Sequence, residues 1–169
     1  MQLSFEEFVA ARSGALWRSA YLLTGDRQKA EDLLQTALVK VWRRWDSIVR
    51  REAAEAYVRA AIATTYTDWW RRRWNGEVPT SALPDAAGPC ESTGVEVRRD
   101  VLAALARLPR GQRAVVVLRF FDDLSEQQTA DALGVSVGTV KSQTSRALAA
   151  LRTSPLFQID GAATEGERP

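Results

Sequence analysis

The sequence contains no histidine, and its single cysteine is Cys90. Without histidine there is no imidazole general base, no His-containing catalytic triad and no His-ligated metal. One cysteine cannot form an internal disulfide, and the polar segment around it favours an incidental thiol over a reactive one. Since the sequence also offers no carboxylate pair for acid/base work, we predict a protein that is not an enzyme and uses no cofactor.

Long apolar runs are missing as well. No stretch approaches the roughly 20 residues that cross a membrane. The first residues, MQLSFEEF, carry acids where a signal peptide would carry basic residues. We therefore expect a cytoplasmic protein without membrane insertion. Its net charge is only +2, but basic residues crowd between Arg50 and Arg73, whereas residues 74–97 contain acids and no lysine or arginine.

Strand signals are nearly absent, and helical periodicity runs through most of the chain. The fold class we predict is all-α, with two small helical domains joined by a flexible acidic linker. A capping box at Ser4 and Glu7 opens the first helix, which ends at Gly25. Further helices are expected over residues 26–45, 52–74, 95–107 and 115–121, with Trp42 on the apolar stripe of the second.

Three prolines and three glycines between residues 76 and 94 forbid a regular element there. The predicted domains are therefore residues 1–75 and residues 95–153, with a linker over 76–94. Residues 154–169 carry little apolar surface and are expected to form a disordered tail.

Residues 124–151 have the layout of a helix-turn-helix. An apolar helix ends at Gly134, three residues turn the chain, and Ser136 can cap a second helix. A second helix of this kind is built to lie in the DNA major groove. Its outward positions carry hydrogen-bond donors and two cations, with no acid from Thr139 to Leu151. These positions are Thr139, Lys141, Ser142, Gln143, Ser145 and Arg146.

Aromatic and basic residues alternate at the end of the helix expected over residues 52–74. Tyr66, Trp70 and Trp74 are spaced four apart and share a face, and Arg71, Arg72 and Arg73 surround the helix end. Rings stack on unpaired bases while guanidinium groups hold phosphates, so this segment suits single-stranded or melted nucleic acid. In the alternative interpretation the tryptophans belong to the core, as we expect for Trp69, and the arginines form a solvated helix end.

The helix-turn-helix and the aromatic and basic helix together give the chain from Phe5 to Arg152 a resemblance to the sigma factors of the extracytoplasmic-function group, which direct bacterial RNA polymerase to promoters. Residues 30–42 resemble the family's polymerase-binding helix, and residues 57–73 resemble its promoter-melting helix, with Asp68 at a recurring acidic position. Residues 108–119 and 133–142 resemble the domain that reads the −35 element. The block WWRRRW indicates the SigE-like actinobacterial branch.

The resemblance implies roles that the residues alone do not assign. Core polymerase would contact Asp32, Gln35, Leu38 and Lys40. The −10 element would be bound by Thr64, where the family often has asparagine, and by Tyr66, Trp70, Arg71, Arg72, Arg73 and Trp74. The −35 element would be bound by Arg113 and Arg119, mainly through the DNA backbone, and by Thr139, Lys141, Ser142, Gln143, Ser145 and Arg146.

The implied partners are core RNA polymerase, promoter DNA and an anti-sigma factor, and we expect the free chain to be a monomer. The function that we infer is promoter-specific initiation of transcription through the −35 and −10 elements. The alternative is a stand-alone helix-turn-helix repressor or activator, which would dimerise on a palindrome without polymerase. A third interpretation, an RNA-binding or structural helical bundle, explains the basic aromatic helix but leaves the carboxyl-terminal motif unexplained.

Overall fold

A computed structural model of the chain describes residues 3–49, 54–74 and 98–154. Within these ranges the regular structure is helical and contains no strand, which confirms the predicted all-α class. The predicted linker over 76–94, the tail beyond residue 154 and Cys90 lie outside the described residues.

Helix α1 spans Phe5–Thr24, and its two ends are set by local signals. The Ser4 hydroxyl accepts from the Glu7 amide at 3.1 Å, and the Glu7 carboxylate accepts from the Ser4 amide at 2.9 Å, which confirms the predicted capping box. Gly25 ends the helix with φ of 69°, a left-handed conformation that glycine adopts at no steric cost.

The second predicted helix is divided in two by a turn at Arg43 and Arg44. Helix α2 spans Arg27–Trp42, and a separate short helix, α3, spans Trp45–Val49. The turn brings the Trp45 ring against α1, with centroids 5.4 Å from Phe5 and 5.1 Å from Phe8. This aromatic cluster stabilises the turn. The apolar periodicity of the second helix does not reveal the turn, because the contacts that stabilise it come from α1.

Helix α4 spans Ala54–Trp74 and is followed, after the undescribed segment, by the second helical unit. The elements of the second unit are α5 (Arg99–Ala106), α6 (Arg110–Val116), η1 (Val117–Phe121), α7 (Glu126–Leu133) and α8 (Val137–Arg152). The element η1 is a π-helical turn that joins α6 to the loop before α7.

The helix-turn-helix prediction is confirmed by α7, α8 and the turn between them. Gly134 ends α7 with φ of 66°, and the Ser136 hydroxyl accepts from the Thr139 amide at 3.1 Å to cap α8. Ala130 and Leu133 of α7 are buried, as their spacing predicts. This local geometry sets the direction in which α8 leaves the turn.

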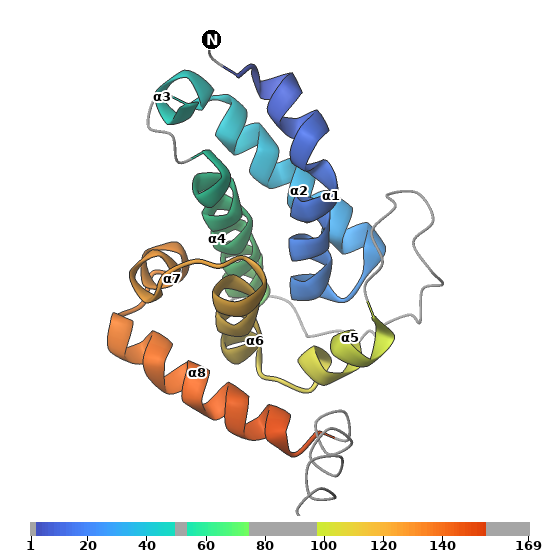
Figure 1. Cartoon of the computed structure of the whole chain (residues 1–169), viewed down its shortest axis with the longest axis vertical. Helices are drawn as coiled ribbons and strands as arrows, with labels where there is room; N and C mark the ends of the chain where they lie inside the picture. The colour runs from blue at the N-terminus through green and yellow to red at the C-terminus, as the bar shows by residue number, and fades with distance from the viewer. Residues whose placement is uncertain (1–2, 50–53, 75–97, 155–169) are drawn as a thin grey trace, which may run out of the picture.

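The two helical units pack directly against each other. Figure 1 shows α4 in the middle of the molecule, with α1 and α2 on one side and α7 on the other. One hydrophobic cluster runs through both units and includes Val58 and Ile62 of α4 together with Leu118 of η1 and Ala132 of α7. The sequence predicted two domains, and the structure adds a shared interface between them.

Candidate nucleic-acid interface

Helix α8 presents a polar, cationic surface on the side away from its packing contacts. It packs against α6 and α7 through Val140 and Ala147, which are fully buried. The opposite side is exposed at four of the predicted positions, namely Lys141, Ser142, Ser145 and Arg146. Thr139 and Gln143 are half-buried. The exposed donors therefore lie on the side of α8 that a major groove can reach.

Two of the predicted DNA-binding side chains on α8, Lys141 and Gln143, are affected by their neighbours in the structure. Lys141 lies 3.9 Å from a carboxylate oxygen of Glu126, a distance at which an exposed pair contributes little. Gln143 buries its side-chain oxygen without a hydrogen-bond partner among the described residues. Gln143 therefore presents less of its amide to solvent than its place on the helix suggested.

Arg113 and Arg119 were predicted to contact the DNA backbone at the −35 element. In the structure, both side chains instead donate hydrogen bonds to backbone carbonyls of the protein. Arg113 is buried, and its Nε donates to the Leu22 carbonyl at 2.6 Å. Burial lowers the pKa of Arg113, while Tyr66 raises it. Arg119 donates from Nη1 to the Leu124 carbonyl at 2.6 Å. A contact of either guanidinium with DNA stays a prediction.

The predicted −10 residues near the end of α4 are divided between core and surface. Tyr66 and Trp69 pack against the hydrophobic cluster, and burial raises the pKa of Tyr66, against the opposing charge of Arg113. Trp70 is 38% exposed, with the Arg110 guanidinium 5.7 Å from its ring centroid. Arg71 and Arg72 are exposed, whereas the side chains of Arg73 and Trp74 lie outside the described part of the structure.

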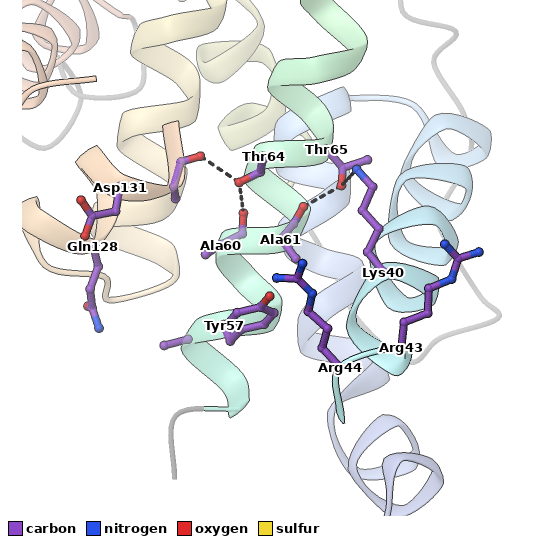
Figure 2. Close-up of a pocket in the computed structure, with 12 residues that line it drawn as sticks. Lys40, Arg43, Arg44, Tyr57, Ala60, Ala61, Thr64, Thr65, Gln128 and Asp131 are labelled. Atoms are coloured by element: carbon purple, nitrogen blue, oxygen red, sulfur yellow. Dashed lines mark hydrogen bonds between the residues drawn. The ribbon is translucent and has the colours of Figure 1, made fainter. Parts of the chain in front are cut away.

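Thr64 lies at the boundary between α4 and α7, beside a cavity of about 660 Å³ (Figure 2). Its hydroxyl is 2.8 Å from the Ala60 carbonyl and 2.9 Å from the Ala132 carbonyl of α7. Figure 2 shows basic side chains of α2 and of the turn after it on one side of the cavity, and Gln128 and Asp131 of α7 on the other. In this conformation α7 therefore contacts the surface predicted to bind the −10 element at Thr64, while Thr64, Trp70, Arg71 and Arg72 all remain exposed.

Three residues that line the cavity were missed as site residues by sequence reasoning. Arg43 and Arg44 lie at the end of α2, and Tyr57 lies on α4 seven residues before Thr64. A spacing of seven residues puts Tyr57 and Thr64 on the same side of α4, so helical geometry could have identified Tyr57 as a neighbour of Thr64. The turn that brings Arg43 and Arg44 to this cavity left no comparable signal in the sequence.

The four residues predicted to bind polymerase lie on different sides of α2. Asp32 and Gln35 are exposed on the outer side. Leu38 is half-buried and packs against the hydrophobic cluster. Lys40 leans toward α4, where its Nζ lies 3.2 Å from Thr65 Oγ1 and 3.8 Å from Asp68. The polymerase-binding role of all four stays a prediction.

Two large apolar side chains complete the outer side of α2. Val39 is 53% exposed and Trp42 is 60% exposed, so the placement of Trp42 on the buried stripe was wrong. At 100° per residue, Trp42 lies opposite the buried Leu33, and a helical-wheel count would have shown this. An exposed tryptophan with a valine beside it is typical of a protein-binding surface.

Within the described ranges, two further classes of site find no support. No helix there has both the length and the apolar content to cross a membrane. No group of three or more Cys, Asp or Glu side chains in those ranges is arranged to hold a metal ion.

Comparison with known proteins identifies the family. Residues 8–76 match the family model for Sigma-70 region 2, and residues 98–151 match the model for Sigma-70, region 4. The chain is 49% identical over 151 residues to the RNA polymerase sigma-E factor of Streptomyces avermitilis, covering 89% of this chain and 84% of that protein. It is 32% identical to the ECF RNA polymerase sigma factor SigL of Mycobacterium tuberculosis, covering 90% and 86% of the two chains.

The solved structure of the sigma factor RpoE in complex with the anti-sigma factor NepR from Bartonella quintana is similar, with a TM-score of 0.69 and 25% identity. The match covers 88% of this chain and 94% of the solved one. The chain therefore belongs to the sigma-70 family, in its extracytoplasmic-function group. It is an RNA polymerase sigma factor, which excludes the stand-alone repressor or activator.

Proposed function

We propose that three surfaces of this sigma factor divide the work of initiation. The outer side of α2 binds core RNA polymerase, α4 holds the unpaired −10 strand, and α8 reads the −35 element in the major groove. The chain supplies no catalytic group, because strand opening is driven by binding to the unpaired strand. The observation that carries this assignment is the exposed, acid-free surface of α8 on a correctly capped helix-turn-helix.

For core polymerase, the outer side of α2 offers one continuous contact surface. Asp32, Gln35, Val39 and Trp42 follow each other at spacings of three or four residues and are all exposed. We place the apolar centre of the contact at Val39 and Trp42, with Asp32 and Gln35 as polar contacts around it. Leu38 and Lys40 would then support the helix from the side of α4.

For DNA, the cations and hydroxyls of α8 suit the acceptors of base edges and phosphates. On α4, the exposed Arg71 and Arg72 suit phosphates, and the ring of Trp70 offers a stacking surface. The cavity beside Thr64 has Tyr57, Arg43 and Arg44 on its walls, so it combines an aromatic ring with positive charge. We include these three residues in the proposed −10 surface.

The remaining partners follow from the family. We propose that an anti-sigma factor binds this chain, because a similar solved structure is a sigma factor in complex with one. We also propose that the free chain is a monomer in the cytoplasm, together with the polymerase it serves. Sedimentation of the purified chain at several concentrations tests the monomer, and a concentration-dependent dimer contradicts it.

Transcription with purified components tests the proposed function. Core polymerase alone and core polymerase with the chain are compared on promoter-bearing fragments, and transcripts should start at defined sites only when the chain is present. If the chain neither binds core polymerase nor directs any start site, the proposed function is wrong.

A further inference from the structure

The loop between η1 and α7 contains a strained residue that the proposed promoter contacts do not explain. Asp123 has φ of 54°, and it is the only residue other than glycine with a positive φ in the described ranges. This left-handed conformation is unfavourable for side chains with a Cβ atom, although aspartate tolerates it better than most. Strain of this kind persists only where the surrounding structure enforces it.

The chain is held on both sides of Asp123. Before it, the buried carboxylate of Asp122 pairs with Arg59 of α4. After it, the Leu124 amide donates to the Leu118 carbonyl at 2.9 Å, and the Leu124 side chain is only 3% exposed. The left-handed turn at Asp123 is therefore the connection between two fixed residues.

Arg119 of η1 provides a second hydrogen bond to Leu124. Its Nη1 donates to the Leu124 carbonyl at 2.6 Å, so residues of η1 hold Leu124 at both its amide and its carbonyl. The hydrogen-bond ladder of α7 begins one residue later, where the Ser125 carbonyl accepts from the Thr129 amide at 2.9 Å. The Leu124 carbonyl therefore lies outside that ladder and takes its donor from Arg119.

Leu124 in turn sets where the helix-turn-helix begins. The next residue, Ser125, is the N-cap of α7: its hydroxyl accepts from the Gln128 amide at 3.0 Å, and its amide donates to Gln128 Oε1 at 2.9 Å. Helix α7 ends at Gly134 and packs against α8. The hydrogen bond from Arg119 thus holds the start of the motif that presents the exposed polar side of α8.

The Arg119 side chain cannot keep this hydrogen bond and also swing out to DNA. The residue is half-buried, and its Nε is buried without a hydrogen-bond partner among the described residues. If Nη1 turned to a phosphate, the partly buried Leu124 carbonyl would lose its donor, which is costly. Lys141 and Arg146 of α8 are already exposed and need no such rearrangement.

We propose that Arg119 is a positioning residue for −35 recognition. It binds the Leu124 carbonyl, holds the strained turn at Asp123, and so fixes the start of α7 and the direction of α8. It keeps this contact with the protein while the promoter is bound. Both partners belong to the second unit, so the contact does not depend on how the two units meet. The consequence at the promoter rests on the proposed function, whereas the hold on the turn is a property of the chain alone.

Hydrogen exchange on the full-length chain tests the hold on the turn. In Arg119→Met the Leu124 carbonyl loses its donor, and we expect the Leu124 and Gln128 amides to exchange about tenfold faster, the factor expected for one lost hydrogen bond to a charged group. Arg107→Met makes the same change at an exposed arginine that follows α5. This matched control should leave both exchange rates unchanged.

Relief of the strain at residue 123 separates this hold from a DNA contact. Glycine adopts a φ of 54° at no steric cost, so Asp123→Gly should restore slow exchange to Arg119→Met. Because Asp123→Gly also removes a negative charge, the single Asp123→Gly variant completes a double-mutant cycle. The gain from glycine should be larger in the Arg119→Met background than in the wild type.

The holoenzyme extends the test to the promoter. The probe is a promoter fragment on which wild-type holoenzyme initiates, compared with the same fragment scrambled in its −35 segment. Arg119→Met should lower the preference for the intact fragment about tenfold, leave binding to core polymerase unchanged, and regain the preference when Asp123→Gly is added. The slope of the logarithm of the DNA-binding constant against the logarithm of the salt concentration should keep its wild-type magnitude.

A phosphate contact by Arg119 predicts a different pattern. The magnitude of that slope would fall by about 0.9 in Arg119→Met, and Asp123→Gly would not restore the preference. Either this pattern or wild-type exchange at Leu124 and Gln128 in Arg119→Met overturns the positioning role.

Two further arms keep the outcome decisive. Arg119→Lys retains a donor and should exchange more slowly than Arg119→Met at the same amides, and it replaces Arg119→Met in the cycle if the latter loses the helical circular dichroism of the wild type. If the wild-type holoenzyme starts no transcript on any fragment, the proposed function is wrong, and the exchange rates still decide whether Arg119 holds the turn.

Discussion

Trp42→Ala gives the sharpest test of the polymerase-binding surface on α2. A tryptophan buries up to about 250 Å² when it is fully covered, so the 60% exposure of Trp42 leaves roughly 150 Å² available to a partner. At about 25 cal/mol per Å² this area sets a ceiling of about 3–4 kcal/mol. Because association costs consume part of that free energy, we expect a loss of about 2 kcal/mol, or roughly 30-fold weaker binding to core polymerase.

The assay is competition between unlabelled variants and labelled wild-type chain for purified core polymerase, followed by fluorescence anisotropy. Leu3→Ala is the matched control, because Leu3 is 46% exposed in the same unit but precedes α1 and is not part of α2. The folding stability of Trp42→Ala should stay within about 0.5 kcal/mol of wild type, since the ring is mainly in solvent. Binding of Trp42→Ala equal to that of Leu3→Ala would refute the surface.

Three further predictions concern α8 and the interface. Lys141→Ala with Arg146→Ala should impair −35-dependent initiation and leave binding to core polymerase intact. The slope of the logarithm of the DNA-binding constant of the holoenzyme against the logarithm of the salt concentration should fall in magnitude by up to about 1.8, which filter binding at several salt concentrations measures. Loss of core binding would contradict the assignment. Ser136→Ala should destabilise the chain by about 1 kcal/mol, seen as a lower midpoint in thermal unfolding, because α8 loses its cap. Since burial raises the pKa of Asp122 in the folded chain, the folded state binds the extra proton, so this carboxyl's contribution to stability should be lost as pH rises through its raised pKa; thermal unfolding at several pH values checks this, and Asp122→Asn should remove the dependence.

Much of the fold was predictable because its signals are local. The capping box at Ser4, the glycine at residue 134 and the serine cap at residue 136 each act over three or four residues, and all three were confirmed. Four of the six outward positions predicted on α8 are exposed, which followed from the same short-range geometry, whereas Thr139 and Gln143 are half-buried. Trp42 was misplaced although the helical period already held the information.

The contacts between the units could not be predicted in this way. Asp122 and Arg59 are 63 residues apart, and Arg113 and Leu22 are 91 residues apart, so neither pair leaves a trace in local periodicity. The family resemblance assigned Arg113 to the DNA backbone, whereas the structure buries Arg113 and pairs it with the Leu22 carbonyl.

The sequence by itself determined most of the helices, the caps of α1, α7 and α8, and the polar exposed side of α8, because hydrogen bonds and side-chain spacing within a few residues specify them. Only the tertiary structure decided that α4 packs against α7 beside Thr64, and that Arg113 of α6 binds a carbonyl at the end of α1. The reason is physical: burial and long-range pairing depend on which surfaces meet in space, and the order of residues along one helix does not contain that information.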